Sequence, residues 1–435
     1  MHWSRFGQRF TQSSGILELM QDLDLALNQS DQDLLMLGGG NPCQIPEMED
    51  LFRQIMQAIL NTFGSFESLV GIYDHPGGDS ESIAHLADFL SLELGWPVSP
   101  EHIALSNGSQ HSFFNLFSIL AGEMEDGSFR RILLPMCPEY IGYADTGIHA
   151  GLFLTRRPAF EFSAPNEFIY QLPFGSLQQL CNAAGSSIGA LCVSRPANPT
   201  GRMLADADVD RLLDLAKSIH VPLIVDGAYG LPFPGIVFDP AGSVQAVWRP
   251  GMIMTLSLSK FGLPGTRTGI VIAEPHIITL LGRMNAITNL ATGSLGPALL
   301  SELLQRKLLL ECSRNIIQPH YAAKSRQAQS ALHEAMQSRA PDVEYAVHQS
   351  QGAFFLWLWL RNLPVTTRVL YNELKRSGVL VVPGEYYFPG MEEDDWQHKH
   401  ECIRISFAQD PHTVARGVEI IAQTAQRLVE TGNGR

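Results

Sequence analysis

Long apolar runs are missing from this sequence. The longest, AFFLWLWL at residues 353–360, is far too short to span a bilayer and predicts a buried strand instead. The N-terminal stretch MHWSRFGQRFTQSSG also lacks the apolar core of a signal peptide. These absences predict a cytoplasmic protein with no membrane partner.

Cysteine is scarce and scattered. No cysteine belongs to a C-x-x-C pair or has the spacing of a metal finger. Scattered cysteines are typical of reduced thiols in the cytosol, and the missing ligand spacing predicts no metal site. The cysteines are Cys43, Cys137, Cys181, Cys192, Cys312 and Cys402.

Basic residues are outnumbered, since 30 Lys and Arg stand against 44 Asp and Glu for a formal net charge of −14. We expect no nucleic-acid partner, because phosphate backbones attract cationic proteins. A local cationic pocket for a small anion is compatible with this total. With 435 residues, 45% hydrophobic and 17% charged, the chain is expected to fold into a globular protein of two domains.

Short apolar runs alternate with helical patterns through the middle of the chain. Residues 207–219 are predicted to form an amphipathic helix, because apolar side chains recur there at helical spacing. Strands that alternate with helices favour an α/β fold with a mostly parallel sheet covered by helices. The runs that predict strands are HIALS (102–106), RILLPM (131–136), IGALCVS (188–194), VPLIVD (221–226), MIMTLS (252–257) and TGIVIA (268–273).

The C-terminal part differs from the middle. After a helix-rich stretch near residues 297–335, the runs AFFLWLWL, VLVVPG and CIRISFA predict strands of a second, smaller sheet. We therefore expect a large domain over residues 46–310 and a small domain over residues 311–435. The N-terminal segment, residues 1–45, is expected to join neither core cleanly.

The most informative stretch is TLSLSKFGLPGTRTG at residues 255–269. Lys260 follows an apolar strand, and burial of such a lysine lowers its pKa, so that its neutral amine can attack an aldehyde. Ser257, Ser259 and Arg267 supply hydrogen-bond donors suited to a dianionic phosphate. The alternative is a surface turn with one solvated lysine and one solvated arginine.

Two further stretches follow strands of the predicted sheet, where open α/β sheets bind ligands. In SRPANPTGRML (194–204), Asn198 can donate to a phenolate oxygen, and a simple Asn-Pro turn is the alternative. In VPLIVDGAYG (221–230), Asp226 ends an apolar strand and needs a cation there, such as a protonated pyridine nitrogen. Tyr229 is a candidate donor to the 3-oxygen of that ring, whereas helix capping by Asp226 is the alternative.

The last two stretches favour anion binding. In LSNGSQHSFFNLF (105–117), a turn opens a helix whose free N-terminal N–H groups can bind phosphate. A capped helix without a ligand is the alternative. In CIRISFA (402–408), Arg404 is flanked by apolar residues, and its planar guanidinium fits a carboxylate. The alternative is a structural salt bridge.

These blocks occur in a characteristic order. Along nearly the whole chain, LGGGNP, YDHPGG, SNGSQ, PEYIGY, SRPANPTG, VDGAY, SLSKFGLPGTRTG and IRISFA resemble the fold-type-I aminotransferases of the aspartate aminotransferase superfamily, which depend on pyridoxal 5'-phosphate (PLP). PEYIGYAD, SLSKFGLPG and VPGEYYFPG resemble more specifically the bacterial valine–pyruvate aminotransferases. The resemblance implies a large PLP-binding domain, a smaller α/β domain to which the N-terminal segment contributes near the active-site entrance, and a homodimer with shared active sites.

The resemblance also implies roles around the cofactor ring. Lys260 would carry PLP as a Schiff base and act as the general base. Asp226 would pair with the pyridine nitrogen. Asn198 and Tyr229 would bind the 3-oxygen, and Tyr140 would stack on the ring.

Other positions would hold the phosphate and the substrate. Arg267 lies one residue closer to Lys260 than in the best-known members, and the Ser-Gln pair of the phosphate loop is not the commonest choice there. The phosphate ligands would be Gly108, Ser109, Gln110, Ser257, Arg267 and, from the second subunit of a dimer, Tyr73. The substrate carboxylate would be bound by Arg404, Gly40 and Asn198.

The implied reaction is ping-pong transamination between an apolar amino acid and a 2-oxo acid. The expected pair is valine with pyruvate, giving 3-methyl-2-oxobutanoate and alanine. Other amino-acid specificities, a PLP-dependent β-lyase and a non-enzymatic regulator that senses PLP or amino acids remain open. Such regulators usually carry a DNA-binding module, for which this chain has no spare N-terminal length and no basic patch. Ile16, Phe113 and Tyr140 are candidates for the substrate side-chain pocket.

Overall fold

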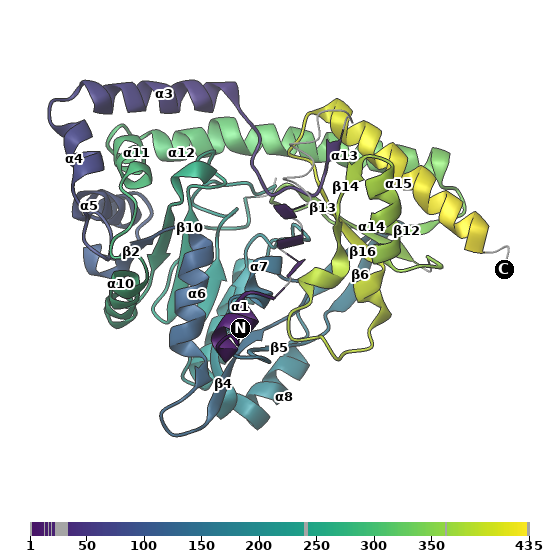
Figure 1. The fold of residues 1–435 in the computed structure, drawn as a ribbon, viewed down its shortest axis with the longest axis horizontal. Coiled ribbons are helices and arrows are strands. Elements are labelled where there is room, and N and C mark those ends of the chain that lie inside the picture. Colours follow the sequence, from purple (N-terminus) through teal and green to yellow (C-terminus); the bar gives the residue numbers. More distant parts are fainter. Residues whose placement is uncertain are drawn as a thin grey trace.

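Two β-sheets with helices packed around them form the fold (Figure 1). The computed structural model describes residues 2–12, 14–15, 17–18, 20–21, 34–238, 242–361 and 363–432. The larger sheet has the strand order β2-β11-β10-β9-β8-β4-β3, and β5 pairs with β4. Its strands are β2 (Ile103–Ser106), β3 (Gly122–Glu123), β4 (Phe129–Leu134), β5 (Phe153–Thr155), β8 (Ile188–Ser194), β9 (Leu223–Asp226), β10 (Met252–Ser257) and β11 (Gly269–Ile272).

The centre of the larger sheet is parallel. Strand β9 pairs in parallel with β10 and with β8, and β8 pairs in parallel with β4. Strand β11 runs antiparallel to both β10 and β2. Every residue of β8, β9 and β10 is buried, as in a parallel sheet covered on both faces. The predicted α/β fold is confirmed, and each of the six predicted strands is present within two residues at either end.

Helices of this part of the chain bury amphipathic faces. The predicted helix over residues 207–219 is α9 (Asp206–Ser218), which contacts β8 and β9. Further helices before residue 318 include α1 (Arg5–Phe10), α3 (Pro46–Asn61), α4 (Ser65–Gly71), α5 (Ser80–Asp88), α6 (Ser109–Leu120), α7 (Ile141–Ala144), α8 (Phe174–Ala184), α10 (Pro275–Thr288), α11 (Leu295–Gln305) and α12 (Leu308–Cys312), with the π-helical turns η1 (Phe89–Glu93) and η5 (Ser313–Ile317) and the 3₁₀ turns η2 (Pro100–His102), η3 (Gly185–Ser187) and η4 (Pro264–Thr266).

The second sheet lies on the C-terminal side of the molecule (Figure 1) and has the order β15-β16-β13-β12-β7-β6. The long helices α13 (Gln318–Arg339) and α15 (Pro411–Gly432) pack against each other. The other elements are β6 (Ala159–Ala164), β7 (Glu167–Gln171), β12 (Glu344–His348), β13 (Phe355–Arg361), α14 (Thr367–Arg376), β14 (Val379–Leu380), β15 (Val382–Pro383), η6 (Gly384–Tyr387), η7 (Gln397–His400) and β16 (Cys402–Ser406).

Two segments from earlier in the chain join this C-terminal part. Strand β7 pairs in parallel with β12, so β6 and β7 extend the second sheet. The short strand β1 (Leu35–Met36) pairs in parallel with β14. The domain limits predicted at residues 45 and 310 stay a prediction. None of the described helices combines the length and apolarity needed to cross a bilayer.

The packing of β8 against α6 generates a stability prediction. A Cβ atom at Gly189 would lie 1.9 Å from the backbone oxygen of Leu120. Gly189→Ala is therefore expected to lower the free energy of unfolding by about 3 kcal/mol, because neither backbone segment can move without disturbing its element. Urea unfolding followed by circular dichroism measures this. The control is Gly175→Ala in α8, where a Cβ meets no atom within 4 Å. Equal unfolding midpoints for the two variants would contradict the packing described.

Candidate active site

Lys260 lies in the turn after β10, close to the aromatic rings of Tyr229 and Phe354. Its Nζ donates to the backbone oxygen of Gly40 at 2.6 Å and lies 5.5 Å from the centre of the Tyr229 ring. Burial lowers the pKa of Lys260 from 10.5 to about 8, and the positive charges of Arg404 and Arg267 act in the same direction. A substantial neutral fraction is thus available near neutral pH for attack on an aldehyde.

Asp226 ends β9 with its carboxylate buried. Tyr143 Oη donates to Asp226 Oδ2 at 2.7 Å, and Ala228 N donates to Oδ1 at 3.0 Å. Burial raises the pKa of Asp226, while the hydrogen bonds from Tyr143, Ala228 and Thr255 oppose this rise. A cation placed against this carboxylate would stabilise its charged form.

Polar donors gather where α6 begins. Gly108 precedes the helix with φ 95°, and a Cβ there would lie 2.4 Å from Arg267 Nη2. Glycine therefore lets the guanidinium lie across the helix N-terminus, whose first N–H groups have no helical partner. Ser109 is the first residue of α6, and Ser257 Oγ accepts from Ser259 N at 3.0 Å. This set of donors suits a dianion.

Gln110 is oriented differently from the other predicted phosphate ligands. Its side-chain Nε2 donates to the backbone oxygen of Gly142 at 2.9 Å. Its Oε1 is buried and has no hydrogen-bond partner among the described residues. The group that Gln110 offers to an anion is therefore its backbone N–H in the first turn of α6.

Arg404 projects from β16 of the second sheet. Its Nη1 donates to Asn198 Oδ1 at 2.9 Å, and its Nη2 donates to the backbone oxygen of Gly38 at 2.6 Å. Its Cζ lies 4.1 Å from the centre of the Phe355 ring. Its Nε is buried without a hydrogen-bond partner in the described part of the chain, so the guanidinium retains a donor for an incoming acceptor. No described carboxylate forms a salt bridge with it.

These groups share one cavity of about 200 Å³. Phe113 and Tyr140, two candidates for the substrate side-chain pocket, line it, whereas Ile16 lies outside the described residues. Gly108 borders the cavity through Arg267, and Tyr73 is 81% exposed and does not line it. The predicted site residues along its wall are Gly40, Ser109, Gln110, Tyr140, Asn198, Asp226, Tyr229, Ser257, Lys260, Arg267 and Arg404.

Comparison with known proteins agrees with this geometry. Residues 151–421 match the family "Aminotransferase class I and II". Over 427 residues, 98% of this chain and 99% of the relative, the sequence is 42% identical to the valine–pyruvate aminotransferase of Escherichia coli (strain K12). The chain belongs to the class I and II aminotransferase family.

Solved structures extend this similarity to the whole fold. A structure from Psychrobacter arcticum 273-4 superimposes with a TM-score of 0.93 and 39% identity, covering 99% of both chains. The valine–pyruvate aminotransferase of Salmonella typhimurium LT2 has a TM-score of 0.84 and 39% identity, covering 95% of this chain and 99% of its own. The fold-type-I aminotransferase architecture predicted from the motifs is thereby confirmed.

Two residues beside the site of this aminotransferase were not among the predicted ones. Tyr143 donates to Asp226, and Glu139 accepts from Ser194. Both belong to the block PEYIGYAD, which drew attention through Tyr140 alone. Local sequence cannot reveal their hydrogen-bond partners, because Asp226 lies 83 positions beyond Tyr143 and Ser194 lies 55 positions beyond Glu139.

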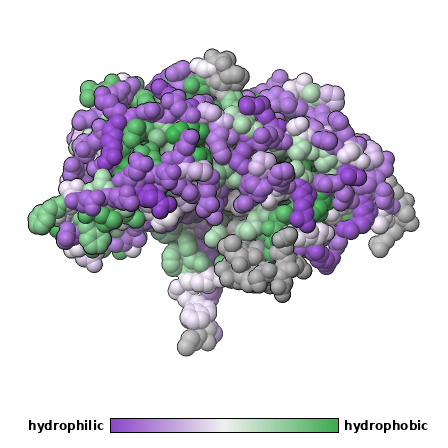
Figure 2. Space-filling view, turned by 90° about the horizontal axis from the view of Figure 1, so that it is seen from above, coloured by the Kyte–Doolittle hydropathy of each residue, from purple (hydrophilic) through white to green (hydrophobic). Residues whose placement is uncertain are grey.

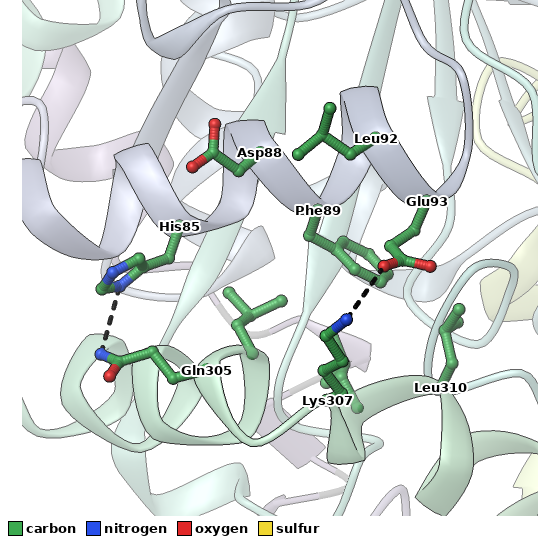
Figure 3. A pocket seen from close by; sticks show the side chains of 10 residues that line it. His85, Asp88, Phe89, Leu92, Glu93, Gln305, Lys307 and Leu310 are labelled. Atoms are coloured by element: carbon green, nitrogen blue, oxygen red, sulfur yellow. Dashed lines mark hydrogen bonds and ion pairs between the residues drawn. The ribbon is translucent and has the colours of Figure 1, made fainter.

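A second, larger cavity of about 340 Å³ opens elsewhere, between η1 and the segment that joins α11 to α12 (Figure 3). Four of its polar side chains form two pairs: His85 Nδ1 lies 3.4 Å from Gln305 Nε2, and Lys307 Nζ lies 4.0 Å from Glu93 Oε1. Both members of the Lys307–Glu93 pair are more than half exposed, so the interaction is weak. Size alone therefore does not identify the active site, and the convergence of buried ionisable groups favours the smaller cavity.

The lowered pKa of Lys260 predicts its chemical reactivity. Acetylation of Lys260 by trace acetic anhydride is expected to rise with pH, reach half of its maximum near pH 8 and then level off, because only the neutral amine reacts. Peptide mass spectrometry of the protein without cofactor measures it, with the exposed Lys307 as the reference for reagent. A half-maximum near pH 10.5 would mean that the amine is not desolvated.

Proposed function

We propose that this chain catalyses transamination between an apolar amino acid and a 2-oxo acid with PLP as cofactor, and that valine and pyruvate are its substrate pair. The observation that carries the proposal is the convergence of a half-buried amine, a buried carboxylate and a partly unpaired guanidinium on one cavity, at Lys260, Asp226 and Arg404. Membership of the aminotransferase family supports it.

The residues present fit PLP. The cradle of Gly108, Ser109, Ser257 and Arg267 offers donors for a phosphate dianion at one end of the cavity. Asp226 stands where a protonated ring nitrogen would stabilise its buried charge. When bound, PLP supplies an aldehyde that forms an imine with an amine, and a ring that accepts electrons from the substrate Cα.

The residues around the ring would position the cofactor and hold or move protons on it and on the substrate. Asp226 would keep a proton on the ring nitrogen, and Asn198 and Tyr229 would hydrogen-bond the 3-oxygen. Tyr140 would pack against the ring face. Lys260 Nζ would take the proton from the substrate Cα and deliver it to C4′, the carbon that carried the cofactor's aldehyde, in the ordinary manner of a general base of pKa near neutrality.

Arg404 would bind and orient the substrate carboxylate. Its unpaired Nε and the stacking on Phe355 favour a planar anion in a fixed orientation. Among the described residues, the arginines along the cavity are Arg267 and Arg404, and the former belongs to the phosphate cradle. A carboxylate on the side chain of the substrate would therefore meet no further arginine among the described residues of the cavity, which favours substrates with apolar side chains. The relative from Escherichia coli is named for valine and pyruvate.

A panel of amino donors tests the proposed reaction. With pyruvate as acceptor, valine is expected to be converted to 3-methyl-2-oxobutanoate with one alanine formed per turnover, whereas aspartate is expected to react poorly. The purified protein with PLP should show a near-ultraviolet or visible band that borohydride abolishes, and Lys260→Ala should lack both the band and turnover. Turnover of aspartate but not valine would refute the substrate pair. Pyruvate and ammonia released from a β-substituted amino acid without acceptor would favour the β-lyase.

We also propose that the enzyme is a homodimer with shared active sites. Exposed apolar side chains around α4 support this, because a single chain rarely leaves such a group in water. Figure 2 displays hydrophobic atoms at the end of the molecule where Figure 1 places α4. The exposed residues are Phe63, Phe66, Val70, Ile72 and Tyr73, with Ile287, Leu290 and Leu295 farther along the chain.

Mixed dimers test whether active sites are shared. If Tyr73 reaches the phosphate of the partner's cofactor, Tyr73→Ala and Lys260→Ala chains are each expected to be impaired. Their heterodimer contains one site with both native residues, so unfolding and refolding the mixture should restore activity well above that of either variant alone. Sedimentation velocity verifies the dimer. No recovery in a verified mixture would place Tyr73 in its own subunit's site or outside any site.

A further inference from the structure

Glu139 has a buried carboxyl group that does not line the cavity but contacts Ser194, which does. It follows β4 and immediately precedes Tyr140, and only 1% of its surface is exposed. No described lysine, arginine or histidine forms a salt bridge with it. An ionised carboxylate in such a place is unfavourable unless strong donors or a cation compensate for its lost hydration.

The donors that reach Glu139 are neutral, and they belong to two cofactor-facing segments. Ser194 N donates to Glu139 Oε1 at 2.9 Å, and Ser194 Oγ forms a close hydrogen bond with Oε2. Tyr140 N lies 3.3 Å from Oε2. Ser194 ends β8 and leads into the loop with Asn198, so the carboxyl group joins that loop to the segment whose ring faces the cavity at Tyr140.

A second carboxylate lies close by. Ser194 is the neighbour of Asp226 across the parallel pair β8–β9, so Glu139 and Asp226 approach the same strand ends. The ionisable groups that interact electrostatically with Glu139 among the described residues are Cys137, Tyr143, Cys192 and Asp226, and all of them are acids. The pKa of Glu139 is raised to about 8, chiefly by burial, with the charge of Asp226 acting in the same direction and the hydrogen bonds from Ser194 opposing both.

We propose that Glu139 is a positioning residue that acts as a neutral acid, holding the Tyr140 segment against the Ser194–Asn198 loop while Asp226 retains the negative charge that faces the cofactor ring. This inference rests on the proposed PLP site. As a neutral acid, Glu139 accepts from Ser194 N through one oxygen and donates to Ser194 Oγ through the other. Glutamine reproduces the two interactions with Ser194 but cannot accept from Tyr140 N as Oε2 does, whereas alanine removes all three.

The stability of Glu139→Gln without cofactor separates a neutral acid from an anion. A carboxyl whose pKa is near 4.5 unfolded and about 8 folded binds its proton more tightly in the folded state, so its contribution to stability is lost as pH rises from 4.5 to 8. Glutamine has no such proton. The melting temperature of Glu139→Gln relative to the parent is therefore expected to increase between pH 5 and pH 8, by several degrees. A variant that becomes less stable than the parent over this range would overturn the proposal.

Cofactor affinity tests the positioning role. Glu139→Gln is expected to bind PLP within about threefold of the parent, and Glu139→Ala roughly tenfold more weakly, because two hydrogen bonds that hold cofactor-facing segments are lost. Titration of the cofactor-free protein by fluorescence measures both. If Glu139→Ala does not fold, the pH dependence of Glu139→Gln decides alone. Equal weakening in both variants, with the parent still binding PLP normally, would overturn the inference but not the proposed function.

Glu401→Ala provides the matched control. Glu401 is also a buried glutamate, and its Oε2 accepts from Trp359 Nε1 at 2.8 Å, but it does not line the cavity. Its loss is expected to lower the melting temperature while leaving the PLP dissociation constant unchanged. If this variant weakens PLP binding as much as Glu139→Ala does, general destabilisation explains the effect and the positioning role of Glu139 is refuted.

Discussion

Three cationic side chains, those of Lys260, Arg267 and Arg404, share one small cavity, and the chemistry of this aminotransferase depends on how their mutual repulsion is resolved. An arginine guanidinium is a permanent cation in proteins, whereas a lysine ammonium can lose its proton. Lys260 therefore becomes the group that responds, and burial together with the charge of Arg404 lowers the pKa of its ammonium to about 8. The cation that would bind a carboxylate thus helps to prepare the amine that would attack.

Two neighbouring carboxyl groups, those of Asp226 and Glu139, present a similar conflict between like charges. Asp226 and Glu139 approach the ends of two adjacent parallel strands, where two buried negative charges would repel each other. With Glu139 neutral, as we infer, the charge stays on Asp226, which also accepts from Tyr143 and Ala228. Glu139 in its neutral form thus leaves the negative charge on Asp226, and Lys260, with a pKa of about 8, can both lose and regain its proton, which suits acid–base chemistry near neutral pH.

The two sheets make this arrangement possible. The larger sheet supplies Asn198, Asp226 and Lys260 from the ends of neighbouring strands, where an open α/β sheet leaves room for a ligand. The second sheet supplies Arg404 from β16, and its hydrogen bonds to Asn198 and Gly38 cross from that sheet to the loop after β8 and to the N-terminal part of the chain. Residues of the larger sheet would thus bind the cofactor, whereas Arg404 of the second sheet would bind the substrate from the other side of the cavity.

Local sequence was sufficient to predict the strands of the larger sheet and many of the residues that line the cavity. The buried runs of β8, β9 and β10 carry their own signal, and Asn198, Asp226 and Lys260 follow them directly, so adjacency in the sheet brings them together. The conformation of Gln110 depends on where Gly142 lies, and only the folded chain reveals it.

Contacts between distant segments were decided by tertiary structure alone. The hydrogen bond from Tyr143 to Asp226, the passage of Arg267 over Gly108 and the addition of β6 and β7 to the second sheet join residues far apart in the chain. No periodicity or spacing encodes such pairs, since each depends on how whole elements pack. The sequence by itself thus determined which side chains could do the chemistry, and packing decided which of them meet and which of them carry charge.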